Sequence, residues 1–474
     1  MKTKNIKYFC FGLMMVVVCA SAIQKAFHIF SVPHLYGVTT YTDKPKFKIE
    51  DWSSSYYQTN YEKNLEENFG FRNDLVRLNN QLDYWFFKKS NAANMVVGKN
   101  DFLYLQGYLD EYKGYNFIGK DAIKFKLQNL SKAQQFLKAH NVDLITVLAP
   151  GKASYYPEYF DRFNANRKQK TTNYNQIISN YEKYGINLID FNKWFVQMKD
   201  TSSSKLFPQQ GIHWSYYGAY LAADSIIKYI EDKRKCDLPD YVTSFETNQK
   251  ANYGDEDLEH ILNLIYKLPE YKMSYPKISF AKDSTKSKLK LLVVGDSFYW
   301  QIYESEIFKN AFAEETFWYY NTTIYPIEKA NGKKVDDLDF LSEILKYDVI
   351  IILNAQGDYH DLSYTFTDKL LPNFSLKDKY QTEFFVKIKD QPDYYERALL
   401  ISNKNKIDID AAMNILADSL ALNKMSQIQE TIQSIKGNME WYNQIVSKAE
   451  KSNRPLNEIL TEDAEWFLEN EKSK

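Results

Sequence analysis

Ser297 stands near the end of the most informative stretch of the sequence, Leu289–Tyr299 (LKLLVVGDSFY). An apolar run typical of a buried parallel strand ends at the Gly-Asp-Ser triplet, and a helical pattern follows over residues 298–312. A strand that turns into a helix lifts the next side chain out of the sheet edge and directs free helical N–H groups toward it. Ser297 is therefore placed as a nucleophile, although a serine that only caps the helix fits the same pattern.

A hydroxyl nucleophile needs a base near neutral pH, and imidazole is the usual one. His213 lies in Gln209–Asp224 (QQGIHWSYYGAYLAAD), directly before the apolar-periodic stretch 216–230. Of the six histidines, only His213 and His360 lie on loops at the ends of predicted core elements. We predict His213 as the base, with His360 as its competitor.

Five ordered segments carry a family resemblance. A strand ending in GDSF, preceded in the chain by a helix start with HW, resembles the SGNH-hydrolase-like alginate O-acetyltransferases, the AlgX and AlgJ family. The other segments that agree are Glu67–Arg72 (ENFGFR), Val97–Tyr104 (VGKNDFLY), and Ala149–Lys152 (APGK) with Tyr156–Glu158 (YPE). The resemblance covers roughly residues 60–360. It implies that the serine is acylated, that the histidine is the base, and that an acyl group passes to a polysaccharide hydroxyl.

One position departs from the family pattern, which has an acidic residue two before the histidine. Gly211 stands there in this chain. The acid normally holds the imidazole tautomer and stabilises the imidazolium. Three alternatives follow: a carboxylate from elsewhere, with Asp358 or Asp361 as the predicted orienting acid; a Ser–His dyad oriented by a backbone carbonyl; or a catalytically weak relative.

Asn354 is predicted to help hold the oxyanion together with the Ser297 N–H. It ends the predicted core strand 347–353, and a carboxamide is a suitable donor to a developing oxyanion. An asparagine that only initiates a turn is the alternative. In the SGNH fold a glycine is the third donor, and the predicted strand 316–320 ends without one.

Composition excludes several classes of function. The 474 residues include 60 Lys and Arg and 61 Asp and Glu, so the net charge of −1 argues against a nucleic-acid binder. The sequence has no Walker loop, no GxGxxG motif and no Cys/His cluster at zinc spacing, and we expect neither cofactor nor metal.

The N-terminus reads as a targeting or anchoring segment. Lys2, Lys4 and Lys7 precede an uncharged run over residues 8–24, whose length lies between a signal-peptide core and a membrane span. Residues 20–22 (ASA) offer a cleavage site, but we favour an uncleaved anchor with the bulk outside the cytoplasm. We therefore expect a protein on the periplasmic side of the cell membrane, or a periplasmic one if the segment is cleaved.

Strand and helix patterns alternate, which predicts an α/β fold with an SGNH- or flavodoxin-like doubly wound parallel sheet. The expected organisation is a signal anchor or signal peptide over 1–25, a stalk over 26–60, an SGNH-like domain over 61–375 with an insertion at 236–286, and a helical tail over 380–474. The tail holds two copies of a 47-residue repeat that begin at Ile388 and Ile435. A capping bundle is the expected role of the tail, with partner docking as the alternative.

These observations and the resemblance lead to one expected function and two alternatives. We expect an extracytoplasmic O-acetyltransferase that acts on a polysaccharide acceptor through a Ser acyl-enzyme. The resemblance further implies a multi-pass membrane acyltransferase that supplies the acyl group. The alternatives are an SGNH carbohydrate esterase and a catalytically weak polysaccharide-binding or assembly protein.

Overall fold

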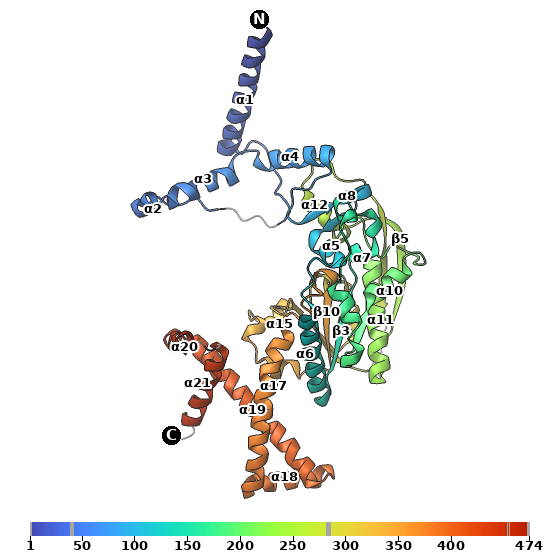
Figure 1. The fold of residues 1–474 in the computed structure, drawn as a ribbon, viewed down its shortest axis with the longest axis vertical. Coiled ribbons are helices and arrows are strands. Elements are labelled where there is room, and N and C mark those ends of the chain that lie inside the picture. Colours follow the sequence, from blue (N-terminus) through green and yellow to red (C-terminus); the bar gives the residue numbers. More distant parts are fainter. Residues whose placement is uncertain (1, 38–41, 281–285, 453, 455, 472–474) are drawn as a thin grey trace.

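A computed structural model describes residues 2–37, 42–280, 286–452, 454 and 456–471. Figure 1 shows a long helix at the N-terminal end, an α/β body in the middle and a group of long helices at the C-terminal end. The predicted site residues lie in the α/β body. Its sheet contains the strands that the sequence patterns predicted.

A six-stranded sheet forms the centre of the body, in the order β4-β3-β10-β7-β8-β9. The first five strands run parallel, and the edge strand β9 is antiparallel to β8. The predicted α/β fold class is confirmed, with this antiparallel edge as an addition. The bounds are β3 Asp143–Ala149, β4 Leu188–Asp190, β7 Lys290–Gly295, β8 Glu314–Tyr319, β9 Thr323–Tyr325 and β10 Val349–Ala355.

Helices cover both faces of the sheet. Strand alternation sends Ile350 and Ile352 of β10 into one core layer and Val349, Ile351 and Leu353 into the other. The first layer is covered by α6 Lys120–Ala139, α9 Asn173–Ile178, α16 Phe340–Ile344 and α17 Phe366–Asp390; the second is covered by α10 Phe191–Met198, α11 Tyr216–Arg234, α13 Trp300–Glu304 and α14 Ile307–Ala311. Because both faces are covered, β10 is buried along its whole length, as its continuous apolar run predicts.

Shorter elements surround the body. The VGKNDFLY segment forms an antiparallel hairpin. The bounds are β1 Met95–Val97, β2 Leu103–Leu105, α5 Gln106–Lys113, α7 Lys152–Tyr155, α8 Arg162–Asn166 and α15 Ile327–Ala330.

The helix expected after Ser297 differs from what is observed. It is broken at Glu306, whose backbone is in the left-handed region with φ 58°, so α13 and α14 are separate. In the insertion, the sequence pattern at residues 258–268 also indicates one amphipathic helix; the observed helix is α12 Asp257–Leu262, which ends because Asn263 has φ 50°. The insertion also contains an antiparallel pair, β5 Tyr241–Lys250 and β6 Lys272–Phe280, whose largely polar and exposed strands gave no clear pattern. Residues 281–285 lie outside the described residues.

Four α-helices precede the β1–β2 hairpin in the described part of the chain: α1 Lys2–Phe27, α2 Ile49–Ser53, α3 Tyr56–Asn68 and α4 Arg72–Phe87. Within the described chain, the segment Lys4–Phe27 is the one helix long and apolar enough to cross a membrane. The region expected as a stalk contains α2 and the start of α3; its residues 38–41 lie outside the described ones.

The tail begins earlier than expected, because α17 starts at Phe366. It continues with α18 Pro392–Asn405, α19 Ile409–Gly437, α20 Met439–Ser452 and α21 Leu456–Glu471. Positions 47 residues apart have the same environment: the buried Ile388, Ala398 and Ala417 correspond to the buried Ile435, Ile445 and Ala464. Each stretch consists of a helix end, a shorter helix and a helix start.

Candidate active site

Ser297 begins a 3₁₀ turn, residues 297–299, directly after β7. The preceding Asp296 holds this turn in place, because its carboxylate accepts the N–H of Phe298 at 2.9 Å and the N–H of Ala355 at 2.6 Å. The hydroxyl of Tyr364 donates to the same carboxylate at 2.7 Å. Burial raises the pKa of Asp296 to about 6. The nucleophile turn is thus tied to the end of β10 and to the loop before α17.

His213 lies beside Ser297, as the sequence predicts. Its Nε2 is 2.9 Å from the Ser297 Oγ, and its ring packs edge-on against Phe298, with centroids 5.0 Å apart. The neighbouring Trp214 is fully buried and donates its indole N–H to the Phe298 carbonyl at 3.0 Å. Trp214 therefore anchors the loop that carries His213, residues 199–215 and called the histidine loop below, on the turn at residues 297–299. This contact explains why a tryptophan follows the histidine.

Asp257 occupies the other side of the imidazole. Its Oδ2 is 2.8 Å from the His213 Nδ1, and its Oδ1 accepts the backbone N–H of Ile212 at 2.9 Å. One carboxylate thus fixes both the ring and the backbone just before it. Together these contacts form an unbroken Ser–His–Asp chain. Sequence reasoning missed Asp257 because it is the first residue of α12, inside the insertion, and no local motif links it to His213.

The structure brings neither predicted orienting acid to the ring. Asp358 faces the Tyr364 hydroxyl at 3.4 Å, and burial raises its pKa. Asp361 pairs with Lys126 at 3.7 Å. Asp257 takes the position predicted for these two carboxylates, and it also replaces the backbone carbonyl of the dyad alternative. The competing His360 is exposed, whereas His213 contacts the serine.

Gly211 has a steric reason to lack the family's acid. A Cβ at this position would lie 2.7 Å from the Asp255 backbone oxygen and 2.9 Å from its carbonyl carbon. The insertion therefore packs against the glycine and supplies the carboxylate from α12 instead. An aspartate at position 211 would push the insertion away from the histidine loop.

Lys152, from the APGK motif, binds the backbone of the histidine loop. It is fully buried, and its ammonium donates to the carbonyl oxygens of Pro208 at 3.3 Å, of Gln209 at 3.1 Å and of Gly211. Burial lowers the pKa of Lys152 to about 7, and the charge of Asp257 acts in the opposite direction. Lysine at this position fits because three converging carbonyl groups need three donors.

Asn354 lies one strand from the nucleophile strand, level with Asp296. It is fully buried, and both polar atoms of its side chain lack a hydrogen-bond partner among the described residues. Alternation points its side chain toward the layer of Ile352, whereas Trp214 and Phe298 belong to the opposite layer. Its oxyanion role, together with that of the Ser297 N–H, stays a prediction.

The parallel sheet, the serine at the carboxyl end of β7 and the histidine loop that follows β4 define an SGNH-like α/β domain. Residues 95–298 match the family model described as "SGNH hydrolase-like domain, acetyltransferase AlgX". The predicted resemblance to the AlgX and AlgJ acetyltransferases is thus confirmed.

Comparison with individual proteins found one curated relative and several solved structures. The chain is 24% identical over 180 residues to a protein of Azotobacter vinelandii named "Probable alginate O-acetylase AlgJ", a match that covers 36% of this chain and 42% of the relative. The chain therefore spans less than half the length of this relative. Among solved structures, the O-acetyltransferase domain of Pseudomonas putida AlgJ matches at 14% identity with a TM-score of 0.42, covering 58% of this chain and 99% of that domain. Pseudomonas aeruginosa AlgX matches at 14% identity with a TM-score of 0.40, covering 58% and 67%.

Proposed function

We propose that the protein is an extracytoplasmic O-acetyltransferase that moves an acetyl group to a polysaccharide hydroxyl through an acyl-enzyme on Ser297. The observation that carries this proposal is the continuous contact from Asp257 through His213 to Ser297, at 2.8 and 2.9 Å. A serine hydroxyl in this arrangement has its proton acceptor in place and the acceptor ring oriented.

Each proton in the proposed reaction has a defined path. The Ser297 Oγ attacks the acyl carbonyl and its proton moves to the His213 Nε2, while Asp257 stabilises the resulting imidazolium. His213 returns the proton to the leaving group as the carbon–oxygen bond of the donor breaks. An acceptor hydroxyl then gives its proton to His213 and attacks the carbonyl carbon of the acyl-enzyme. His213 passes this proton to the Ser297 Oγ as the bond between that oxygen and the acyl carbon breaks, which releases the acylated acceptor and restores the serine.

The names of the relatives support acetyl as the acyl group, and a polar cavity at the carboxyl-end edge of the sheet supports a carbohydrate acceptor. The cavity, about 490 Å³, lies beyond the carboxyl ends of β3, β4 and β10. One lining residue, Asn192, is buried and its Oδ1 has no partner within the described chain. Polar groups that converge in this way suit a ligand rich in hydroxyl groups. The carboxamide side chains that line this cavity belong to Gln169, Asn175, Asn192, Gln197 and Gln356.

We further propose that α1 is an uncleaved anchor and that the sheet domain lies on the periplasmic side of the cell membrane. The three lysines before the apolar run favour a cytoplasmic N-terminus. By resemblance, a multi-pass membrane acyltransferase supplies the acyl group across the membrane.

The decisive experiment is to incubate the full-length protein with 4-nitrophenyl acetate and locate acetyl groups by peptide mass spectrometry. We expect acetylation of Ser297 in the wild type and none in Ser297→Ala. Ser305→Ala is the matched control, because Ser305 follows α13 and its hydroxyl bonds to the neighbouring backbone, donating to the Ile302 carbonyl and accepting the Ile307 N–H. Turnover of the ester by Ser297→Ala at the wild-type rate would contradict the assignment.

An added oligosaccharide separates transfer from hydrolysis. Acetylated oligosaccharide is the expected product of a transferase, whereas an esterase releases only acetate from the same acyl-enzyme. A protein that binds the oligosaccharide but never acetylates Ser297 would be the assembly protein instead.

A further inference from the structure

Helix α4 carries its polar and apolar faces in the reverse of the usual order. Asn80 and Gln81 are buried against the body: the Asn80 amide donates to the Leu262 carbonyl at 2.9 Å, and the Gln81 carbonyl oxygen accepts the Tyr266 N–H at 2.8 Å. The opposite face is apolar and exposed, at positions three or four residues apart and therefore on one stripe. This exposed stripe consists of Leu75, Leu78, Leu82, Trp85 and Phe86. Trp85 lies at the margin of the stripe, because its ring also stacks on Tyr266 of the body with centroids 5.7 Å apart. A continuous exposed apolar stripe marks a surface that another phase or partner covers.

The start of α4 is fixed to the base of α1. A Cβ at Gly70, just before α4, would lie 2.2 Å from the Ser21 carbonyl oxygen and 2.8 Å from the Lys25 nitrogen. Only a glycine permits this approach of two backbones. Figure 1 shows α4 running away from the lower end of α1 on one side, with α3 on the other side of the junction. The stripe therefore lies where α1 leaves the region that we propose is membrane.

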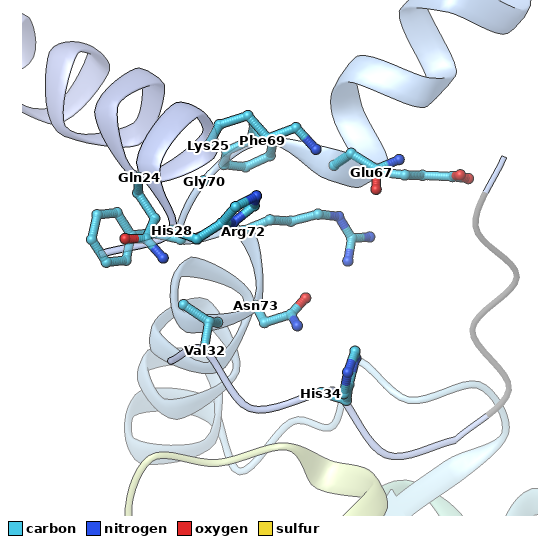
Figure 2. A pocket seen from close by; sticks show the side chains of 12 residues that line it. Gln24, Lys25, His28, Val32, His34, Glu67, Phe69, Gly70, Arg72 and Asn73 are labelled. Carbon is cyan, nitrogen blue, oxygen red and sulfur yellow. The ribbon is translucent and has the colours of Figure 1, made fainter. Parts of the chain in front are cut away.

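Two cavities at this junction follow the polarity profile of a lipid leaflet. The cavity nearer the body, about 270 Å³, is lined by Lys25, His28 and Arg72 as well as Glu67 (Figure 2). The Arg72 Nε donates to the Glu66 carbonyl at 3.1 Å, but its buried Nη1 has no partner among the described residues.

The second cavity, about 480 Å³, lies further toward the N-terminal end of α1. Most of its wall is apolar, and it includes Val17, Val18 and Ala22 from α1. Across from them lie Leu65 of α3 and Phe69. Along α1 the cationic cavity thus comes at the level of headgroups and the apolar cavity at the level of acyl chains.

We propose that α4 lies in the plane of the membrane interface, with its apolar stripe in the acyl region and Arg72 beside lipid phosphates. This inference rests on the anchoring of α1 proposed above. We assign a lipid bilayer to this surface for two reasons. The stripe adjoins the C-terminal end of α1, and a helix with arginine at one end, leucines along one face and a tryptophan at the other end has the composition of an interfacial helix.

The interfacial helix also sets the position of the active site. Asn80 of α4 holds the last residues of α12, and α12 begins with Asp257. The carboxylate of the Ser–His–Asp chain is thus joined through one short helix to the membrane-bound element. The site therefore keeps a fixed orientation toward the bilayer from which the proposed acyl donor arrives.

Nitroxide labels on single-cysteine variants of the full-length protein test this inference. The protein is reconstituted into vesicles of phosphatidylethanolamine and phosphatidylglycerol, with the other native cysteines replaced by serine. Labels at Leu78→Cys and Leu82→Cys should collide severalfold more with oxygen than with a water-soluble nickel chelate. The native Cys19 in α1 is the positive control, and Asp121→Cys on the exposed start of α6 is the aqueous control.

Each outcome is decisive. Nickel-accessible labels at 78 and 82 together with a shielded Cys19 would overturn the interfacial placement and keep the anchor, and a partner protein would then be the occupant. An accessible Cys19 would overturn both the anchor and this inference, while leaving the Ser297 acetylation test unaffected. Retained acetylation of Ser297 in each labelled variant shows that the variant is folded.

Discussion

The acid of the Ser–His–Asp chain comes from a different element than the family pattern predicts. Gly211 leaves room for the insertion to pack against the histidine loop, and the insertion returns a carboxylate from Asp257. This carboxylate also accepts the Ile212 N–H, so it restrains the loop as well as the ring. A carboxylate from a different segment can serve the histidine equally well, because its role depends on its position beside the imidazole Nδ1 and not on its place in the sequence.

Asp257→Asn should lower turnover of an acetyl ester by up to about 10⁴-fold, because the amide favours the wrong imidazole tautomer. The fold should survive, since the amide oxygen can still accept the Ile212 N–H. Glu256→Gln is the matched control, with activity close to wild type expected in the same kinetic assay. A large loss in Asp358→Asn or Asp361→Asn with an active Asp257→Asn would refute the assignment.

Asp296 should make stability depend on pH. Its pKa of about 6 lies above the value of about 4 in an unfolded chain, so the native state binds the proton more tightly. This contribution to the free energy of unfolding is fully present below about pH 4 and is lost as the pH rises through about 6. Asp296→Asn cannot ionise. The stability advantage of the wild type over this variant should therefore be larger at about pH 5 than at about pH 7.5 in urea unfolding. An equal difference at both pH values would show that Asp296 does not titrate in this range.

At the scale of elements, the histidine loop is held between two supports. Lys152 of α7 binds three of its carbonyl groups from one side, and the insertion packs on Gly211 and Ile212 from the other. The loop has little regular structure of its own, so these supports determine where His213 lies. This explains why a lysine far from the nucleophile in the sequence belongs to the same constellation of motifs.

Lys152→Met should destabilise the protein and misplace the histidine. The variant keeps the apolar length of the side chain but removes the Lys152 donor from the carbonyl groups of Pro208 and Gly211, at a cost of about 1–3 kcal/mol each. The Gln209 carbonyl keeps the backbone N–H of Leu103 at 3.1 Å. A small displacement of His213 should lower the turnover number by about 10²-fold. Unfolding curves and amide exchange at residues 209–213 measure these effects. Lys199→Met removes a partly exposed ion pair with Glu158 and the contacts of the ammonium with the rings of Tyr155 and Tyr156, and it should change stability by about 1 kcal/mol or less.

At the scale of the whole molecule, the tail shares the core of the sheet domain. Leu370 and Tyr380 of α17 and Met425 of α19 belong to the same buried cluster as Ile350 of β10. Figure 1 shows α17 beside α6, and the Lys377 ammonium is 2.9 Å from the His140 Nε2 at that junction. The tail is therefore an extension of one sheet face, which favours the capping role over an independent docking module.

A chain that ends at residue 365 should lose its cooperative fold, because removal of α17 exposes the apolar surface of α6 and the first core layer. A chain that ends at residue 438 keeps α17 to α19 and should still acetylate Ser297. Circular dichroism melts and the acetylation assay on the two shortened proteins check this. A stable and active 365-residue chain would show that the tail is a separate module.

The sequence alone determined the elements whose signals are local. The apolar runs of β7 and β10 predicted buried parallel strands, and the strand–turn–helix pattern placed Ser297 at a sheet edge. The His-Trp pair before α11 predicted the position of His213. These predictions agree with the structure because periodicity and turn chemistry act over a few residues.

Tertiary structure decided which distant side chains meet. The missing acid at Gly211 left open a carboxylate from another segment, a Ser–His dyad and a catalytically weak relative, and only the docking of the insertion brought Asp257, rather than Asp358 or Asp361, to the imidazole. In the same way, the sequence of α4 has an ordinary amphipathic pattern, and only its packing shows that the polar face is inside. Contacts of this kind depend on how whole elements pack together, and no local pattern records that packing.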